Sequence, residues 1–139
     1  MAGTYIALAF TVLLLVTKAY FLVGGLPLLV LQHDTPLDGH FVRRFFEVYY
    51  TAAVVAATGA TAGYALWGKP LFAAGTAAIA FTAILLRRVI TPAMQRLGQE
   101  IQTREAPAIA AFRKVHATAL LLNLLQLVAL VWGVIQISA

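Results

Sequence analysis

The sequence predicts an all-α integral membrane protein built as a bundle of four transmembrane helices. Three observations indicate this class: 62% of the 139 residues are hydrophobic, only 11% are charged, and the apolar residues gather in four long stretches. Soluble domains are about half apolar and a quarter charged. A small soluble domain also has too much surface to cover with so little charge. Composition therefore argues against an ordinary soluble domain.

Each apolar stretch is long enough to cross a bilayer, which takes about 20 mostly apolar residues. The chain is predicted to form one domain, 1–139, with spans at residues 5–31, 47–67, 71–90 and 114–137. A turn is expected at WGKP, between the second and third spans. The stretches lack the period-two alternation of a membrane barrel strand.

Basic residues predict the orientation of the bundle. Arg43 and Arg44 lie in segment 32–46 and six more lie between residues 87 and 114, whereas the opposite side has only Lys69. Cytoplasmic loops carry an excess of Lys and Arg. The loops 32–46 and 91–113 are therefore expected in the cytoplasm and both termini outside it, in a bacterial inner membrane.

The most polar part of the chain is segment 93–115, AMQRLGQEIQTREAPAIAAFRKV. It is expected to be a helical extension or an interfacial helix, interrupted near Gly98 and Pro107. Either a solvated connector or a docking surface for a cytoplasmic partner fits its composition.

Charge and cysteine content exclude several function classes. The net charge of +5 does not indicate nucleic-acid binding, because the charges lie between spans and form no basic stripe on a helix. The absence of cysteine excludes disulfides, cysteine-based zinc sites and thiol chemistry. The first apolar stretch is expected to be retained, since it has no preceding Lys or Arg and no clear cleavage site.

Small residues predict where helices approach one another. Gly59 and Gly63 form a GxxxG pair in the second span, and Ala74 and Ala78 repeat the spacing in the third. Helices in lipid associate through close backbone approach, which small residues permit. This helix-packing seam is expected either inside one bundle or between subunits of a homo-oligomer.

Lys18 interrupts the first span, roughly 20 Å from either end at 1.5 Å per residue. A lysine near the middle of a membrane costs about 2.5–3.5 kcal/mol unless it is rescued. A bend or break of the helix at Gly24, Gly25 and Pro27 would shorten its path to water. The alternatives are a carboxylate partner, for which Glu47 is the candidate, or an aqueous cavity.

The fourth span carries His116, Asn123 and Gln126 at spacings that place them on one helix face. This face is expected to point into the bundle, because polar groups facing lipid would be unsatisfied. The group serves either as hydrogen-bonding glue between helices or as one wall of a cavity. The candidate binding site near the cytoplasmic end therefore comprises Lys18, Glu47, Tyr50, Arg88, His116, Asn123 and Gln126.

Four short motifs resemble a known family. They are VGGL at residues 23–26, FEVYY at 46–50, RVITP at 88–92, and FRKVHATALLLNL from 112, in which Phe112, His116 and Asn123 are spaced F-x3-H-x6-N. In their order and spacing the chain resembles the small four-helix membrane protein family that includes human transmembrane protein 205 and bacterial relatives. Glu47 departs from the pattern, since the human relative has proline there.

The resemblance implies a four-helix membrane architecture and points toward export or trafficking, and it carries over no catalytic residues. Three functions are considered from the sequence. The first is a transport or small-molecule-binding module, and the second is an accessory or assembly subunit of a larger membrane complex. The third is a haem- or metal-binding membrane enzyme using His116, although the chain has no HxxxH or HExxH pair and no Ser-His-Asp or nucleophile-elbow spacing. The expected partners are the bilayer and a second copy or partner subunit, with no nucleic acid.

Overall fold

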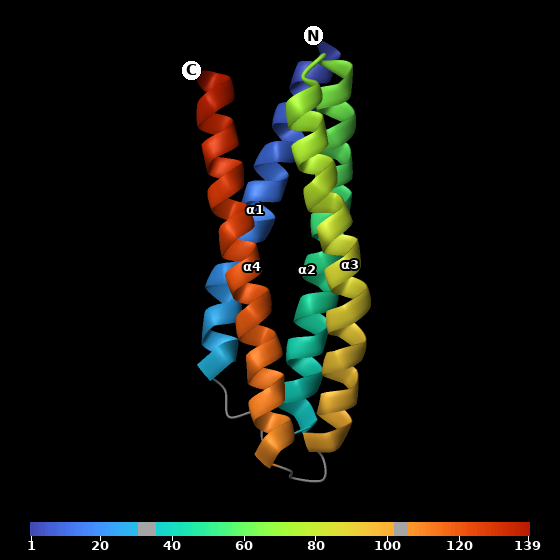
Figure 1. The fold of residues 1–139 in the computed structure, drawn as a ribbon, viewed down its shortest axis with the longest axis vertical. Helices are drawn as coiled ribbons and strands as arrows, with labels where there is room; N and C mark the ends of the chain where they lie inside the picture. Colours follow the sequence, from blue (N-terminus) through green and yellow to red (C-terminus); the bar gives the residue numbers. More distant parts are fainter. Residues whose placement is uncertain (31–35, 102–105) are drawn as a thin grey trace.

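The computed structural model describes residues 1–30, 36–101 and 106–139, which form four helices side by side (Figure 1). The helices are α1 (Ala2–Val30), α2 (Pro36–Leu66), α3 (Pro70–Ile101) and α4 (Ala106–Ser138). Both termini lie at the same end of the bundle (Figure 1). The predicted all-α architecture is confirmed.

Three of the described helices are long and apolar enough to cross a membrane: Ala2–Leu26 in α1, Pro70–Ala93 in α3 and Arg113–Ser138 in α4. Their outward surfaces carry large apolar side chains such as Val12, Leu124 and Trp132. A helix that is apolar on its exposed side as well as its buried side is typical of a membrane environment. These helices indicate a membrane protein. α2 is not among the three.

The helices are arranged so that α2 packs closely along α1 and α3, whereas α4 contacts α1 and α3 less extensively. α2 therefore contributes most to the interior. Its buried residues form a wide stripe with aromatic side chains at both ends and alanines between them: Phe46, Tyr49, Tyr50, Ala53, Ala56, Ala57, Ala60 and Tyr64.

Gly59 and Gly63 lie where α2 meets α1. A Cβ atom on Gly63 would lie 2.3 Å from the backbone nitrogen of Ala7, and one on Gly59 would lie 2.4 Å from the ring of Phe10. A Cβ atom at these distances would overlap its neighbours, so the absence of a side chain at Gly59 and Gly63 permits the close approach of α2 to α1. Ala74 and Ala78 are instead exposed on α3, and an intersubunit seam there stays a prediction.

The predicted turn at WGKP has the geometry of a helix C-cap. Gly68 adopts a positive φ of 75°, which glycine accepts without a Cβ penalty. The amide of Lys69 donates to the carbonyl of Tyr64 at 2.9 Å, and that of Gly68 donates to Ala65 at 3.1 Å. This pair of bonds is the Schellman pattern that ends helices. Pro70 then opens α3, a position where its missing N–H does no harm.

Helices α2, α3 and α4 extend well beyond the predicted spans. The predicted loops 32–46 and 91–113 are helical over most of their length. α2 begins at Pro36, α3 continues to Ile101 and α4 begins at Ala106. α3 also continues through Gly98, so the predicted interruption there is wrong. Helix ends need not coincide with membrane boundaries, because the backbone of a helix bonds to itself in lipid and in water alike.

Candidate functional site

Lys18 points into the bundle because of its position on α1. The buried residues of α1 recur at alternating spacings of four and three: Ala7, Thr11, Leu14, Lys18, Phe21 and Gly25. This is the spacing of a single helix stripe that faces a neighbouring helix. The side chain of Lys18 is fully buried. It does not snorkel to a surface, and α1 is not broken at Gly24 or Gly25 as one sequence hypothesis required.

The ammonium group of Lys18 joins three helices through hydrogen bonds. Its Nζ donates to Tyr49 Oη of α2 at 3.1 Å and to two oxygens of α4, Asn123 Oδ1 at 3.1 Å and Gln126 Oε1 at 2.5 Å. Tyr49 Oη also donates to Asn123 Oδ1, while Asn123 Nδ2 donates to the carbonyl of Ala119 at 2.8 Å. A lysine has three N–H donors, and each has an acceptor here.

The partners of Lys18 are neutral, and this defines the electrostatics of the site. The predicted Glu47 partner lies elsewhere: its carboxylate pairs with Arg44 at 3.6 Å on the surface. Phenol and amide oxygens present partial negative charge, but they do not cancel a full positive charge. A compensating anion would be strongly attracted, because charge interactions are less screened in a low-dielectric interior.

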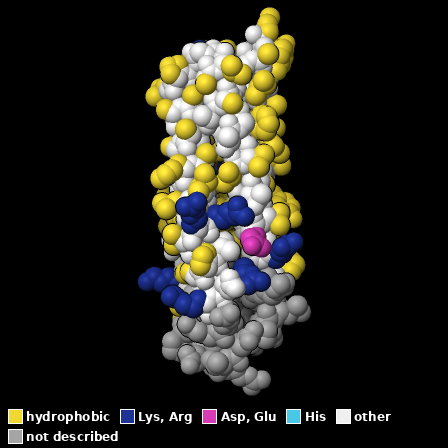
Figure 2. Space-filling model, turned by 90° about the vertical axis from the view of Figure 1, so that its right-hand side faces the viewer, with side chains coloured by type: hydrophobic (Ala, Val, Ile, Leu, Met, Phe, Trp, Pro, Cys, Tyr) yellow, Lys and Arg dark blue, Asp and Glu magenta, His cyan; other side chains and the backbone are white. Residues whose placement is uncertain are grey.

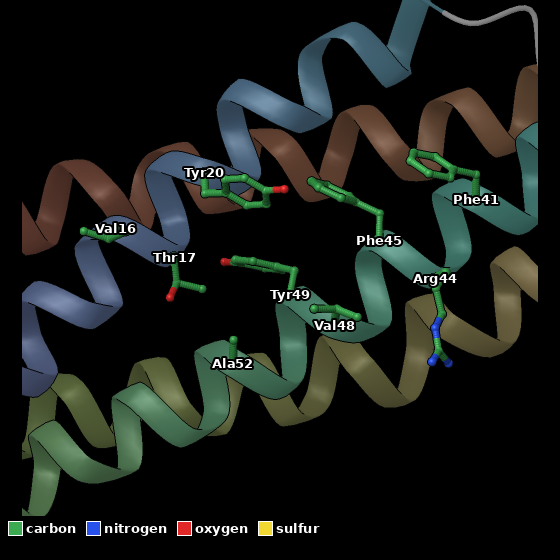
Figure 3. A pocket seen from close by; sticks show the side chains of 9 residues that line it. All are labelled: Val16, Thr17, Tyr20, Phe41, Arg44, Phe45, Val48, Tyr49 and Ala52. Atoms are coloured by element: carbon green, nitrogen blue, oxygen red, sulfur yellow. The ribbon is translucent and has the colours of Figure 1, made fainter.

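A groove between α1 and α2 leads to this cluster (Figure 3). Its volume is about 390 Å³, and its lining is mainly aromatic and aliphatic. The hydroxyl of Tyr49 points toward α1 in Figure 3, so the Tyr49 side chain forms a wall between the groove and Lys18. The residues that line the groove are Val16, Thr17, Tyr20, Phe41, Arg44, Phe45, Val48, Tyr49 and Ala52.

No protein-family model, curated protein or solved structure matches this chain.

Tyr50 and His116 lie in the aromatic core, next to the Lys18 cluster on the side away from the two chain termini. The His116 ring meets the Phe46 ring edge-on, with centroids 5.1 Å apart. The Tyr50 hydroxyl is buried. α1 comes close at Gly25, where a Cβ atom would lie 3.8 Å from His116 Nε2. The structure thus brings five predicted residues into one buried region: Lys18, Tyr50, His116, Asn123 and Gln126.

Glu47 and Arg88 lie outside this buried region. Glu47 is 40% exposed, and Arg88 is exposed on α3. Both line a hollow between α2 and α3. Glu47 follows Phe46 and precedes the outward-facing Val48, so its helix position directs it away from the interior.

The described part of the chain leaves a metal or haem site at His116 a hypothesis. No group of three His, Cys, Asp or Glu side chains there is placed to hold a metal ion. His33 lies outside the described residues, as does the side chain of His40.

Sequence analysis missed Tyr49 and a second polar contact. Thr11 Oγ1 donates to the carbonyl of Ala7 at 2.7 Å and lies 3.0 Å from Tyr64 Oη, so it accepts the Tyr64 proton. Tyr49 lies three residues after the buried Phe46 and four before the buried Ala53, which is the spacing of one helix face. The pattern of buried residues along α2 was the signal that could have identified it.

Proposed function

We propose that the protein is a four-span integral membrane protein with both termini outside the cytoplasm, in a bacterial inner membrane. α2 is the fourth span in this proposal. Its Gly63 lies against Ala7 of α1, and its Thr61 bonds to Thr76 of α3 at 3.0 Å. Because α2 lies between two membrane-length helices at the same level, it shares their depth. Its alanines and glycines serve close packing, which accounts for its lower apolar content.

A cysteine-accessibility experiment tests this orientation. The chain suits it because it contains no cysteine of its own. Single cysteines placed at Met1 and Ala139 are expected to react with an impermeant maleimide added to intact spheroplasts. A cysteine at Arg96 is expected to react only after lysis. Protection of both terminal cysteines until lysis would contradict the proposed orientation.

We further propose that the bundle is a small-molecule-binding module, with transport as its extension, and that its ligand is a small anion held at Lys18. The observation that carries this is a fully buried ammonium group whose hydrogen-bond partners are all neutral. The α1–α2 groove supplies the route, and a rotation of Tyr49 would open the wall between the groove and Lys18. Asn123 and Gln126 keep the ammonium group oriented until an anion arrives.

Anion-dependent stabilisation tests the binding proposal. The purified protein is titrated with chloride, acetate and phosphate at constant ionic strength while its unfolding temperature is measured. At least one anion is expected to stabilise the wild type, by about 2.7 kcal/mol at 100 times its Kd. Lys18→Met is expected to abolish the effect, whereas the exposed Lys69→Met is expected to retain it. An equal response in folded Lys18→Met, or no response of the wild type to any anion, would contradict the proposal.

The motif order and spacing support a further proposal, that the chain belongs to the family noted above. All four motifs meet in the described core, where Ile90 of RVITP belongs to the same buried cluster as Phe46 and Leu120. Gly24 of VGGL lies against Phe45, next to FEVYY, and Gly25 lies against Leu120 of the fourth motif. Phe46 of FEVYY contacts His116. Residues that recur in a fixed order across separate helices have a structural reason to do so when they pack together.

A further inference from the structure

A belt of basic side chains lies on the outer face of α2 and α3. Figure 2 shows dark blue Lys and Arg side chains gathered around a single acidic one in the lower half of the molecule. Glu47 is the one acidic side chain that the structure describes, and Arg44, Arg87 and Arg88 share the surrounding hollows with it. Three guanidinium groups around one carboxylate leave two positive charges uncompensated.

Two hollows meet at this belt. The larger, of about 640 Å³, runs over α2 toward α1, and the smaller, of about 370 Å³, lies between α2 and α3. Both are lined by Glu47 and Arg87. The remaining lining of the larger hollow is mostly apolar: Leu13, Arg44, Val48, Thr51, Ala52 and Val55.

The larger hollow has the length of one lipid leaflet. Arg44 and Val55 mark its ends along α2, eleven residues apart, which corresponds to about 16 Å at 1.5 Å per residue. Half of a bilayer's hydrocarbon core is about 15 Å thick. A chain that starts at the arginines and follows Val48, Ala52 and Val55 therefore reaches the middle of the membrane.

The belt lies at the same depth in the bundle as the Lys18 cluster. Lys18 bonds to Tyr49, two residues from Glu47, so the buried lysine is level with Arg87 and Arg88. Charged side chains at the edge of the hydrocarbon are far less costly than at its centre.

The smaller hollow holds a polar group that lacks a partner. Thr91 Oγ1 is buried and has no hydrogen-bond partner among the described residues. Thr51 and Thr82 on the same two helices instead donate to the carbonyl four residues earlier, at 2.9 and 2.8 Å. Thr91 lines the hollow together with Arg87 and Arg88. Its hydroxyl is therefore able to donate to an oxygen of a ligand bound there.

We propose that the hollows at Arg44, Arg87, Arg88 and Thr91 bind one anionic phospholipid, with its phosphate on the arginines and an acyl chain along Val48, Ala52 and Val55. Arginine suits phosphate because its planar fork donates two parallel hydrogen bonds. Basic pockets between membrane helices bind anionic headgroups in this way. Glu47 faces the same place and accepts a hydrogen bond from a headgroup hydroxyl. The lipid site shares Arg44, Val48 and Ala52 with the rim of the α1–α2 groove. It does not include Lys18, and the lipid proposal does not depend on anion binding there.

Lipid binding to the purified full chain tests the proposal. Native mass spectrometry in detergent compares phosphatidylglycerol with phosphatidylcholine of the same acyl chains. The wild type is expected to prefer the anionic lipid at least tenfold. Arg87→Gln/Arg88→Gln is expected to lose that preference, and Thr91→Val to weaken it two- to fivefold. The control Arg96→Gln/Lys114→Gln removes the same charge from exposed positions outside both hollows and is expected to retain the preference.

A second pair of variants separates the contribution of the larger hollow to lipid affinity from the contribution of the charge. Ala52→Trp fills the larger hollow without changing any charge, and it is expected to lower affinity for phosphatidylglycerol at least fivefold. Ala77→Trp, on the exposed side of α3, is expected to leave it unchanged. Retention of the preference in Arg87→Gln/Arg88→Gln would overturn the site. Equal binding of glycerol phosphate without acyl chains would overturn the lipid as ligand and indicate a free phosphate instead.

Discussion

Gly63→Ala is expected to lower the free energy of unfolding by about 3 kcal/mol, the upper end of the range for overpacking. The new Cβ would lie 2.3 Å from the backbone nitrogen and 2.6 Å from the Cα of Ala7. Backbone atoms cannot rotate out of the way as a side chain does. The contact is relieved only by moving α1 away from α2, which also disturbs the nearby Thr11–Tyr64 bond. Unfolding by SDS titration from mild detergent measures the change.

Gly75→Ala is the matched control, because it makes the same chemical change within a helix where no atom lies within 4 Å of the new Cβ. Its stability is expected to stay equal or to rise by up to about 1 kcal/mol, since alanine orders a helix at a lower entropic cost than glycine. Equal stability of Gly63→Ala and Gly75→Ala would contradict the close α1–α2 contact.

Asn123→Leu is expected to destabilise the protein by about 2–3 kcal/mol. Asn123 Oδ1 accepts from both Lys18 and Tyr49, so its loss leaves two buried donors short of a partner. Neutral hydrogen bonds between membrane helices contribute only about 0.6 kcal/mol on average. Bonds to charged groups contribute about 1.5–3 kcal/mol. The larger range applies because Lys18 is fully buried and water does not replace the lost acceptor.

A double-mutant cycle shows whether the charge of Lys18 is responsible for the destabilisation by Asn123→Leu. Lys18→Met alone is expected to change stability by about 1 kcal/mol or less, because it also removes the cost of burying a charge. In the Lys18→Met background, Asn123→Leu is expected to cost about 2 kcal/mol less than in the wild type. Additive effects of the two substitutions would show that Lys18 and Asn123 do not interact. SDS titration of all four proteins supplies the comparison.

Much of the architecture follows from local features of the sequence. Long apolar stretches predict membrane-length helices, because about 20 mostly apolar residues match the thickness of the hydrocarbon core. The Gly68–Pro70 turn was predictable because left-handed backbone and a first-turn proline each select one residue type. The shared face of His116, Asn123 and Gln126 was predictable because residues three and seven apart on a helix point the same way.

The pairing of those faces was decided only by the tertiary structure. Helical spacing shows that Lys18 and Asn123 each face inward, but not that α1 and α4 meet in the register that joins them. The same spacing allowed Glu47 as the partner of Lys18, and packing placed Tyr49 there instead. Helix ends were also misjudged, because apolar length marks the extent of lipid contact and not the residue at which backbone hydrogen bonding stops.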